Sequence, residues 1–210
     1  MYAVVENNQI TQFINYPKSI VIGEVRYPAK IFTMWSKAEK EAVGIYEIET
    51  DSSNYKDPAY YINTNEQYNF ADNKVVKSWG TATPKQLDDS FWTQEDFDNQ
   101  YLLDNKLIGY LKVKGLKTEK KKIVKQQASG LLAPTDWYIT KATEVADYDV
   151  PANILSFRAD VRTKSNEMET MINNCTTVDE LKALYEYTNT GTEQNPVFTR
   201  PLPEFPKEVI

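Results

Sequence analysis

The spacing of hydrophobic and polar residues divides the chain into a front part with short alternating runs and a rear part with helical periodicity. In the first 35 residues, YAVV and ITQFI flank ENNQ, where Asn7 and Asn8 tolerate the left-handed backbone of a tight turn. The run SIVIGEVRYP that follows is rich in β-formers and ends at Pro28, which cannot donate a ladder hydrogen bond. The pattern predicts a small sheet at this end.

A short helix and a second hairpin complete the front part. In MWSKAEKEAVG, Ser36 can cap a helix, Glu39 can reach back to the cap, and Gly44 can end the helix with a positive φ. The residues IYEI then alternate as a strand does, and YYINTNEQYNF is joined to KVVKSWGT by Asp72 and Asn73. The sequence predicts a hairpin that turns at these two residues.

The segment 84–115 mixes acidic, aromatic and leucine residues without one clean period. We interpret it as a connector or an insertion. Thr93 followed by Asp96 is typical of a helix start and predicts a short helix near 94–103.

The pattern becomes helical after Gly115. An amphipathic spacing is followed by Leu116, Ile123, Gln127, Leu131 and Leu132. Pro134 is expected to break this helix, and Thr135 or Asp136 can cap the segment that follows, because their side-chain oxygens accept from free N–H groups. The ring of Trp137 is expected to pack beneath both helix segments.

A second long helix is predicted after Pro151, which suits a first helical position because its missing N–H would be unpaired there. Its apolar side carries Ile154, Phe157, Val161, Met168, Met171 and Ile172. Arg158 and Arg162 are four residues apart and share another side. The two long helices predict a helical hairpin, and Thr177 opens a last short helix with an apolar stripe of Val178, Leu181, Leu184 and Tyr185.

The predicted fold class is α+β. Four parts are expected: a β-rich N-terminal domain, a connector or insertion, a helical C-terminal domain, and an extended proline-rich tail, which occupy residues 1–83, 84–115, 116–188 and 189–210. The tail sequence PVFTRPLPEFPKEVI contains four prolines and is expected to lie on a surface, either its own or a partner's.

The composition fits a folded protein without histidine chemistry. The 210 residues are 41% hydrophobic and can bury a core. There is no histidine, which excludes the common catalytic triads and zinc sites, and the single Cys175 cannot form an internal disulfide. No apolar run is long enough to cross a bilayer and the N-terminus lacks a signal-peptide pattern, so we expect a soluble protein, made in the cytoplasm, with no membrane insertion.

The net charge of −6 is spread evenly along the chain. The one basic cluster is KTEKKKIVK at 117–125, which could contact phosphates. A solvated helix face explains this cluster as well and is the favoured interpretation. We therefore expect no nucleic-acid partner.

Acidic residues are the only plentiful catalytic groups, and they gather in DDSFWTQEDFD at 88–98. Paired carboxylates could hydrolyse a glycoside, and an acidic loop could bind calcium. The stretch lacks the glycine and the alternating oxygen ligands of a calcium loop, and sequence proximity does not provide a catalytic geometry. A solvated loop is favoured, and no catalytic residue, metal site or cofactor is predicted.

Aromatic residues are frequent in the middle of the chain. Exposed rings stack on sugars, so a glycan site is a candidate at Tyr60, Tyr61, Trp79 and Trp92. Aromatic residues in strands more often belong to a core or to cross-strand pairs, and that interpretation is favoured.

Partner-binding candidates lie in the helical part and in the tail. Trp137 and Tyr138 beside the predicted turn, with Arg158 and Arg162 on the next helix, could form an anchor patch, since Trp, Tyr and Arg concentrate binding energy at interfaces. In the favoured alternative, Trp137 belongs to the core and Asp136 pairs with one of the two arginines. The tail adds Phe198 and Phe205 as partner-binding candidates.

The strings ASGLLAPTDW at 128–137 and VPANILSFRADVR at 150–162, with a proline-rich end, resemble the C-terminal part of bacteriophage tail fibre assembly or tail-associated proteins. The matching positions are Leu131, Leu132, Ala133, Thr135, Asp136, Trp137, Pro151, Phe157, Arg158, Val161 and Arg162. In the front part, AVGIYEI, YKDPAYY and KVVKSW are similar to segments of the same family.

This resemblance implies a non-enzymatic protein that is either a structural subunit of the tail or fibre or a fibre assembly factor. The expected partners are other phage tail or fibre proteins and further copies of the chain, in the virion tail or in the host cytoplasm during assembly. The alternative is a receptor-binding module that recognises host surface glycans through the aromatic middle.

Overall fold

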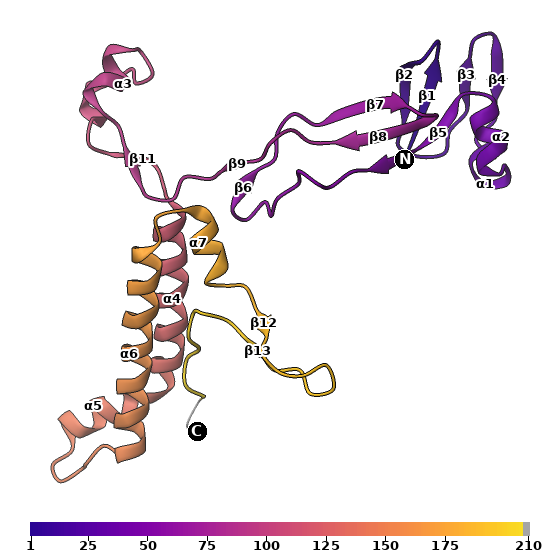
Figure 1. Ribbon diagram of the computed structural model, residues 1–210. Helices are drawn as coiled ribbons and strands as arrows, with labels where there is room; N and C mark the ends of the chain where they lie inside the picture. Colours follow the sequence, from indigo (N-terminus) through magenta and orange to yellow (C-terminus); the bar gives the residue numbers. More distant parts are fainter. Residues whose placement is uncertain (208–210) are drawn as a thin grey trace. The chain divides into compact units, whose positions relative to one another are not determined.

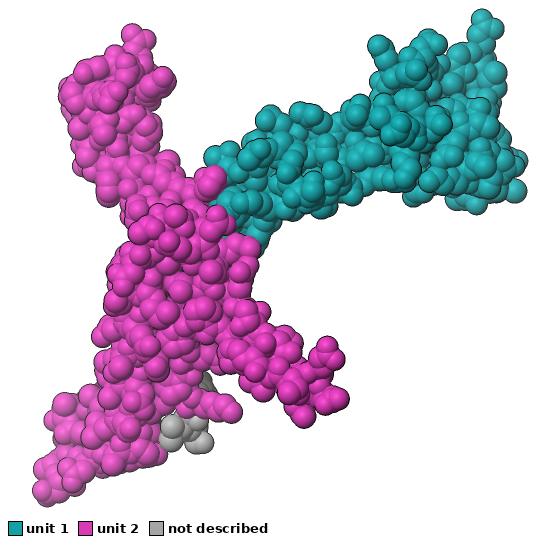
Figure 2. Space-filling view, viewed as in Figure 1, with its two compact units in different colours: residues 1–83 teal, residues 84–210 magenta. Residues whose placement is uncertain are grey.

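The computed structural model describes residues 1–207. The fold is mixed α+β, with a β-rich N-terminal half and a long C-terminal helix (Figure 1). The chain divides into two compact units, Met1–Thr83 and the residues from Pro84 onward, which Figure 2 distinguishes by colour.

The first unit is built around a five-stranded sheet with the strand order β2-β1-β5-β8-β7. Neighbouring strands are antiparallel except for β5 and β8, which are parallel. The strands of the sheet are β1 (Tyr2–Glu6), β2 (Gln9–Ile14), β5 (Ile45–Thr50), β7 (Gln67–Ala71) and β8 (Lys74–Ser78). Two smaller strand pairs are β3 (Ile20–Ile22) with β4 (Val25–Tyr27), and β6 (Tyr61–Ile62) with β9 (Thr83–Pro84).

The two predicted tight turns are confirmed. Asn7 and Asn8 have φ values of 53° and 61°, and Asp72 and Asn73 have values of 50° and 55°. Short polar side chains lower the cost of this left-handed conformation. The run SIVIGEVRYP, expected as one β-rich segment, is instead a hairpin of β3 and β4 that turns at Gly23, where φ is 57°.

The predicted capped helix is α2 (Lys37–Ala42), and a one-turn helix, α1 (Ile31–Met34), precedes it. The Ser36 side chain accepts from the backbone N–H of Glu39, and the Glu39 carboxylate accepts from the N–H of Ser36, as predicted. Gly44 then has a φ of 80°, and a Cβ there would lie 2.6 Å from the carbonyl oxygen of Val5. Glycine is therefore required by both the turn and the close approach of β1.

The sheet carries one apolar cluster on each face. One face packs on α1 and on the β3–β4 hairpin through Val4, Ile14, Ile20, Ile31, Phe32 and Ile45. The other face holds Ala3, Val5 and Val75, with Ile10, Tyr46, Ile48 and Phe70 partly buried around them. Because successive strand residues point to opposite faces, Val4 belongs to one cluster and its neighbours Ala3 and Val5 belong to the other.

The second unit begins with a small lobe over residues 90–113. Its elements are β10 (Ser90–Phe91), α3 (Gln94–Asp98), the 3₁₀ turn η1 (Asn105–Leu107) and β11 (Leu111–Val113), which pairs with β10. Thr93 and Asp96 form the predicted capping box. The helix ends at Asp98, earlier than the expected 94–103, and Gln100 takes a φ of 61° just beyond it.

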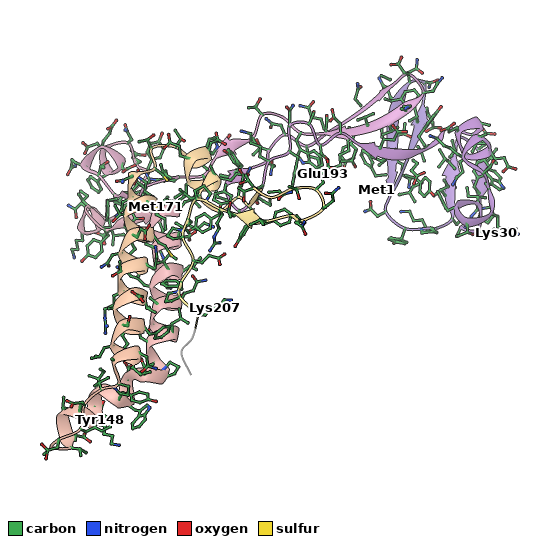
Figure 3. The ribbon with its side chains drawn as sticks, turned by 60° about the horizontal axis from the view of Figure 1, so that its bottom comes forward. Met1, Lys30, Tyr148, Met171, Glu193 and Lys207 are labelled. Atoms are coloured by element: carbon green, nitrogen blue, oxygen red, sulfur yellow. The ribbon has the colours of Figure 1, made fainter. Side chains whose placement is uncertain are left out.

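The main part of the second unit contains two long helices, α4 (Leu116–Leu132) and α6 (Ala152–Asn174), which lie side by side in Figures 1 and 3. Their shared core contains Ala128 of α4 and Phe157 and Val161 of α6. Ile123, predicted on the buried face of α4, is 47% exposed, and Val124 is buried instead. The buried face of α4 is therefore shifted by one residue from the predicted face.

The chain between the long helices forms the 3₁₀ turn η2 (Ala133–Thr135) and the helix α5 (Asp136–Glu144). Figures 1 and 3 show that α5 runs away from the axis of α4, and Figure 3 labels Tyr148 in the loop that leads to α6. Pro134 lies inside η2 and removes a backbone donor there, which accounts for the predicted interruption of α4.

Part of the segment after α6 lies against the helices. The helix α7 (Val178–Ala183) begins with a capping box between Thr177 and Glu180, as predicted. The strands β12 (Thr188–Asn189) and β13 (Phe198–Thr199) pair beyond it. The backbone N–H of Leu202 donates to the carbonyl of Leu184 at 3.0 Å, and the Leu202 side chain is buried.

Candidate functional site

The α4–α5 turn, residues 133–136, is held by Arg158 of α6. Nη1 of Arg158 donates to the Leu132 carbonyl at 3.1 Å, to the Thr135 hydroxyl at 2.6 Å and to a carboxylate oxygen of Asp136 at 2.7 Å. Arg158 is only 7% exposed. A buried guanidinium must find acceptors, and this one finds them all at the end of α4, so it fixes the turn on α6.

Thr135 takes part in this network instead of capping α5, which corrects the prediction. Its hydroxyl donates to the Leu132 carbonyl at 2.7 Å and accepts from Arg158, and it makes no capping bond to α5. Thr135 is buried, and a buried hydroxyl is satisfied by the nearest strong partner. The favoured pairing of Asp136 with one of the arginines is observed, and the partner is Arg158.

Trp137 is 52% exposed, so the expectation that its ring packs beneath both helix segments is wrong. The ring lies 4.2 Å from the ring of Tyr138, measured between centroids. The ammonium of Lys141 lies 5.4 Å from the Trp137 centroid and 4.2 Å from that of Tyr148. The turn thus places a half-exposed aromatic and cationic group beside the Arg158 network.

Arg162 lies one helical turn after Arg158. Its Nη1 donates to the Arg158 carbonyl at 3.2 Å, and its side chain is exposed. Both arginines line a cavity of about 480 Å³ between α4 and α6, together with Asp136 and Lys125. The structure therefore brings Trp137, Tyr138, Arg158 and Arg162 into one region. Arg158 uses its hydrogen bonds on residues 132, 135 and 136 of the same chain.

The two phenylalanines of the tail occupy different environments. Phe198 is in β13 and is 62% exposed. Phe205 is partly buried against Ala128, Phe157 and Val161 of the helix core. Phe198 is thus open to a partner, whereas one side of Phe205 is already covered by the chain itself.

The four aromatic residues considered for a glycan site do not form one cluster. Tyr60 and Tyr61 are buried, so neither offers an open ring face to a sugar. Trp79 belongs to the first unit, where Tyr55 packs on it edge to face at 4.8 Å and the Lys77 ammonium lies 4.9 Å from its centroid. Trp92 belongs to the second unit, in the lobe over residues 90–113.

The acidic residues at 88–98 are bonded within the second unit. Asp89 accepts from the backbone N–H of Gly115 at 2.7 Å and from the Thr118 hydroxyl at 3.0 Å, which ties the lobe to the start of α4. Asp96 pairs with Lys112, and this ammonium together with Thr93 lowers the pKa of Asp96 to about 2. Within residues 1–207, no three acidic or cysteine side chains are grouped closely enough to hold a metal ion.

Comparisons with protein-family models, with curated proteins and with solved structures each give no match. Among the helices of residues 1–207, none combines the length and the apolar character that crossing a membrane requires.

The sequence predictions did not include three residues of this region. Lys141 and Tyr148 join the aromatic group although neither belongs to the recognised strings. Lys125 lines the cavity beside Arg162, whereas the basic cluster was interpreted as a uniformly solvated face. The spacing of Lys121 and Lys125, four residues apart on α4, was the available signal.

Proposed function

We propose that this protein is a non-enzymatic bacteriophage tail-associated protein, either a subunit of the tail or fibre or an assembly factor, that acts through protein contacts. In this proposal α4 and α6 serve as a helical hairpin whose α4–α5 turn docks on other tail or fibre proteins. The proline-rich tail adds a contact through Phe198. The protein functions in the virion tail or, during assembly, in the host cytoplasm, as a homo-oligomer.

The observation that carries the proposal is the pairing of a fixed turn with an exposed aromatic group. Nη1 of Arg158 shares its two hydrogens among acceptors on residues 132, 135 and 136 and so holds this turn, and Trp137 follows directly on it. A tryptophan that is half exposed on an ordered element loses little conformational freedom when a partner covers it. The resemblance to tail-associated proteins falls on this same stretch, residues 131–137.

The test is cross-linking and mass spectrometry on cells infected with a phage that encodes the chain, using tagged full-length protein. We expect phage tail or fibre proteins to be captured. Trp137→Ala with Tyr138→Ala should reduce capture at least tenfold, because aromatic anchors at interfaces contribute about 2 kcal/mol or more. Trp79→Ala, which removes an aromatic ring from the first unit, should leave capture unchanged.

Two results would contradict the proposal. Either no tail or fibre protein is captured by the unmodified chain, or the Trp137 and Tyr138 variant captures as much as the unmodified chain while its circular dichroism is unchanged. Mass spectrometry of purified virions then separates the two roles, since a subunit is present in particles and an assembly factor is absent from them.

A second candidate function is recognition of host surface glycans, and the Tyr55–Trp79 pair favours it. Tyr55 is exposed, its ring packs on Trp79, and the Asn54 side-chain amide donates to the Trp79 carbonyl at 3.2 Å. An exposed ring with polar groups beside it is the usual composition of a sugar-binding surface. Glycan-array binding that is lost in Trp79→Ala would favour this candidate over the first.

A further inference from the structure

Two cavities adjoin each other along one flank of α4. The first, between α4 and α6, has a volume of about 480 Å³, and the second, beside α4 alone, has about 500 Å³. Lys125 and Ser129 line both cavities, so the two hollows adjoin at these residues. We treat the adjoining pair as one groove. We call it the cationic groove, because its lining includes Lys114, Lys121, Lys122, Lys125, Arg158 and Arg162.

Helical spacing separates this groove from the flank that the chain covers itself. Lys122, Lys125 and Ser129 are three and four residues apart and therefore lie on one face of α4. On the other flank, Leu131 and Phe205 of the proline-rich tail both pack on the cluster that contains Ala128, and both line a separate cavity. The tail thus covers one side of α4, and the cationic groove lies on the other.

The groove carries more positive charge than its own carboxylates balance. Lys125 pairs with Glu169 at 3.3 Å, and Arg158 pairs with Asp136 at 2.7 Å. The other cations of the groove have no salt-bridge partner among residues 1–207: Lys114, Lys121, Lys122 and Arg162. In a chain with a net charge of −6, such a concentration of unbalanced cations attracts an anionic partner.

We propose that the cationic groove binds an extended acidic segment of a partner protein. This inference rests on the proposed function, because it names the chemistry by which a tail or fibre partner is recognised. The groove follows α4 from Thr118 to Leu132, about 21 Å at 1.5 Å per residue, which matches roughly six residues of extended chain at 3.3 Å each. Glutamate and aspartate side chains of the segment pair with the unbalanced lysines and Arg162.

The lining favours a peptide over a nucleic acid. Proteins that bind single-stranded nucleic acid stack bases on aromatic rings, and within residues 1–207 the lining of both cavities contains no aromatic side chain. It contains Gln126, Ser129, Ser165 and Asn166 instead, whose amides and hydroxyls can bond a peptide backbone. The aliphatic stems of the lysines supply apolar contact along the walls.

The test measures binding of a fluorescein-labelled hexaglutamate peptide to the full-length protein by fluorescence anisotropy, at low and at physiological salt. We expect saturable binding that weakens as salt rises, because the contacts are partly exposed. Lys122→Glu with Arg162→Glu should raise the dissociation constant at least tenfold. Both side chains are exposed, and neither has a salt-bridge partner among residues 1–207, so the variant keeps the packing of the helices.

A matched control makes the same change of net charge elsewhere. Lys18→Glu with Lys30→Glu alters the first unit and should change the dissociation constant less than twofold. Absence of binding, or equal weakening by both double variants, overturns the proposal. Tighter binding of a thymidine hexanucleotide than of hexaglutamate also overturns it, because the occupant would then be a nucleic acid.

Two further outcomes separate this inference from its alternatives. If sedimentation shows a dimer that Lys122→Glu with Arg162→Glu converts to a monomer, a second copy fills the groove and the proposed occupant is wrong. If hexaglutamate binding fails while Trp137-dependent capture of tail proteins persists, the groove inference falls and the proposed function stands. If hexaglutamate binds as expected but no tail protein is captured, the groove binds acidic peptides and the proposed function falls.

Discussion

At the scale of single residues, Arg158 connects the sequence to the site. It lies on α6 four residues before Arg162, and from sequence alone the two are equivalent partners for Asp136. The structure distinguishes them because Arg158 faces the end of α4 and is buried, whereas Arg162 is exposed and donates to a carbonyl of its own helix. Because Arg158 is buried, losing an acceptor would leave its charge poorly compensated, and losing Arg158 would leave the buried Thr135 hydroxyl without its donor.

Replacing Arg158 should therefore destabilise the second unit. Arg158→Ala removes the donor to the buried Thr135 hydroxyl, one of the two donors to the Leu132 carbonyl and the partner of Asp136. We expect the free energy of unfolding to fall by about 2–4 kcal/mol. Asp136→Asn should cost less than about 1 kcal/mol, because the Asp136 side chain is 62% exposed and solvent screens the pair. Arg162→Ala is the matched control and should change the value by at most about 0.5 kcal/mol.

Chemical denaturation measures these differences in the free energy of unfolding, and amide exchange of the native protein shows whether they fall on α4 and α6. Equal effects of the Arg158 and Arg162 variants would show that the buried network does not hold the turn.

At the scale of elements, the tight turns at Asn7 and Asp72 and the capping box at Ser36 are confirmed, because each depends on residues that are adjacent or three positions apart. The helix starts predicted at Thr93 and Thr177 are also confirmed, and each carries a capping box. Thr135 has an equally suitable side chain, but its partner Arg158 lies 23 residues away and no local pattern reveals it.

Tertiary neighbours also decide which residues of α4 are buried and where its lysines lie. Ile123 and Val124 are both apolar, and only tertiary packing decides that Val124 is buried and Ile123 exposed. The lysines of 117–125 are likewise sorted by tertiary neighbours: Lys117 pairs with Asp88, Lys120 lies over the ring of Tyr185, and others line the cationic groove. The sequence predicts a basic face on this helix, but it does not predict which lysines pair within the chain and which line the groove.

The lobe over residues 90–113 provides a pH-dependent prediction. The pKa of Asp96 falls from 3.8 to about 2, first because the Lys112 ammonium bonds it and then because the Thr93 hydroxyl and backbone N–H do. A lowered folded-state pKa means that the pair stabilises the lobe fully above about pH 4, and that this contribution is lost as pH falls through about 2.

A carbon-13 NMR titration of the Asp96 carboxyl tests this directly. We expect a midpoint near 2 in the unmodified protein. In Lys112→Gln the midpoint should rise toward 3.8, because the largest cause of the shift is removed. Asp98→Asn, a neighbouring change on α3, should leave the Asp96 midpoint unchanged. An unmodified midpoint already at 3.8 would contradict the paired geometry.

At the scale of the whole molecule, each unit has a core of its own. The sheet of the first unit carries an apolar cluster on each face, and the helices of the second unit share a cluster that includes Phe157 and Phe205. A unit with its own hydrophobic core can unfold as a cooperative unit by itself. The proposed contacts all belong to the second unit, apart from the Trp79 alternative, so stability and binding can be tested separately.

Two chemically identical substitutions test this independence. Ile45→Ala and Ile172→Ala each remove a fully buried isoleucine side chain, one from each unit, and each should cost about 2–5 kcal/mol. For a unit of this size, that loss lowers the midpoint of its thermal transition by about 8 °C or more. Calorimetry of the full chain should show two transitions, with each substitution lowering only one of them. Hexaglutamate binding at 25 °C should be unchanged in Ile45→Ala. In Ile172→Ala it should weaken only if part of the second unit is already unfolded at that temperature. If both substitutions lowered one shared transition equally, the chain would be a single cooperative unit, and the division into separate cores would carry no thermodynamic weight.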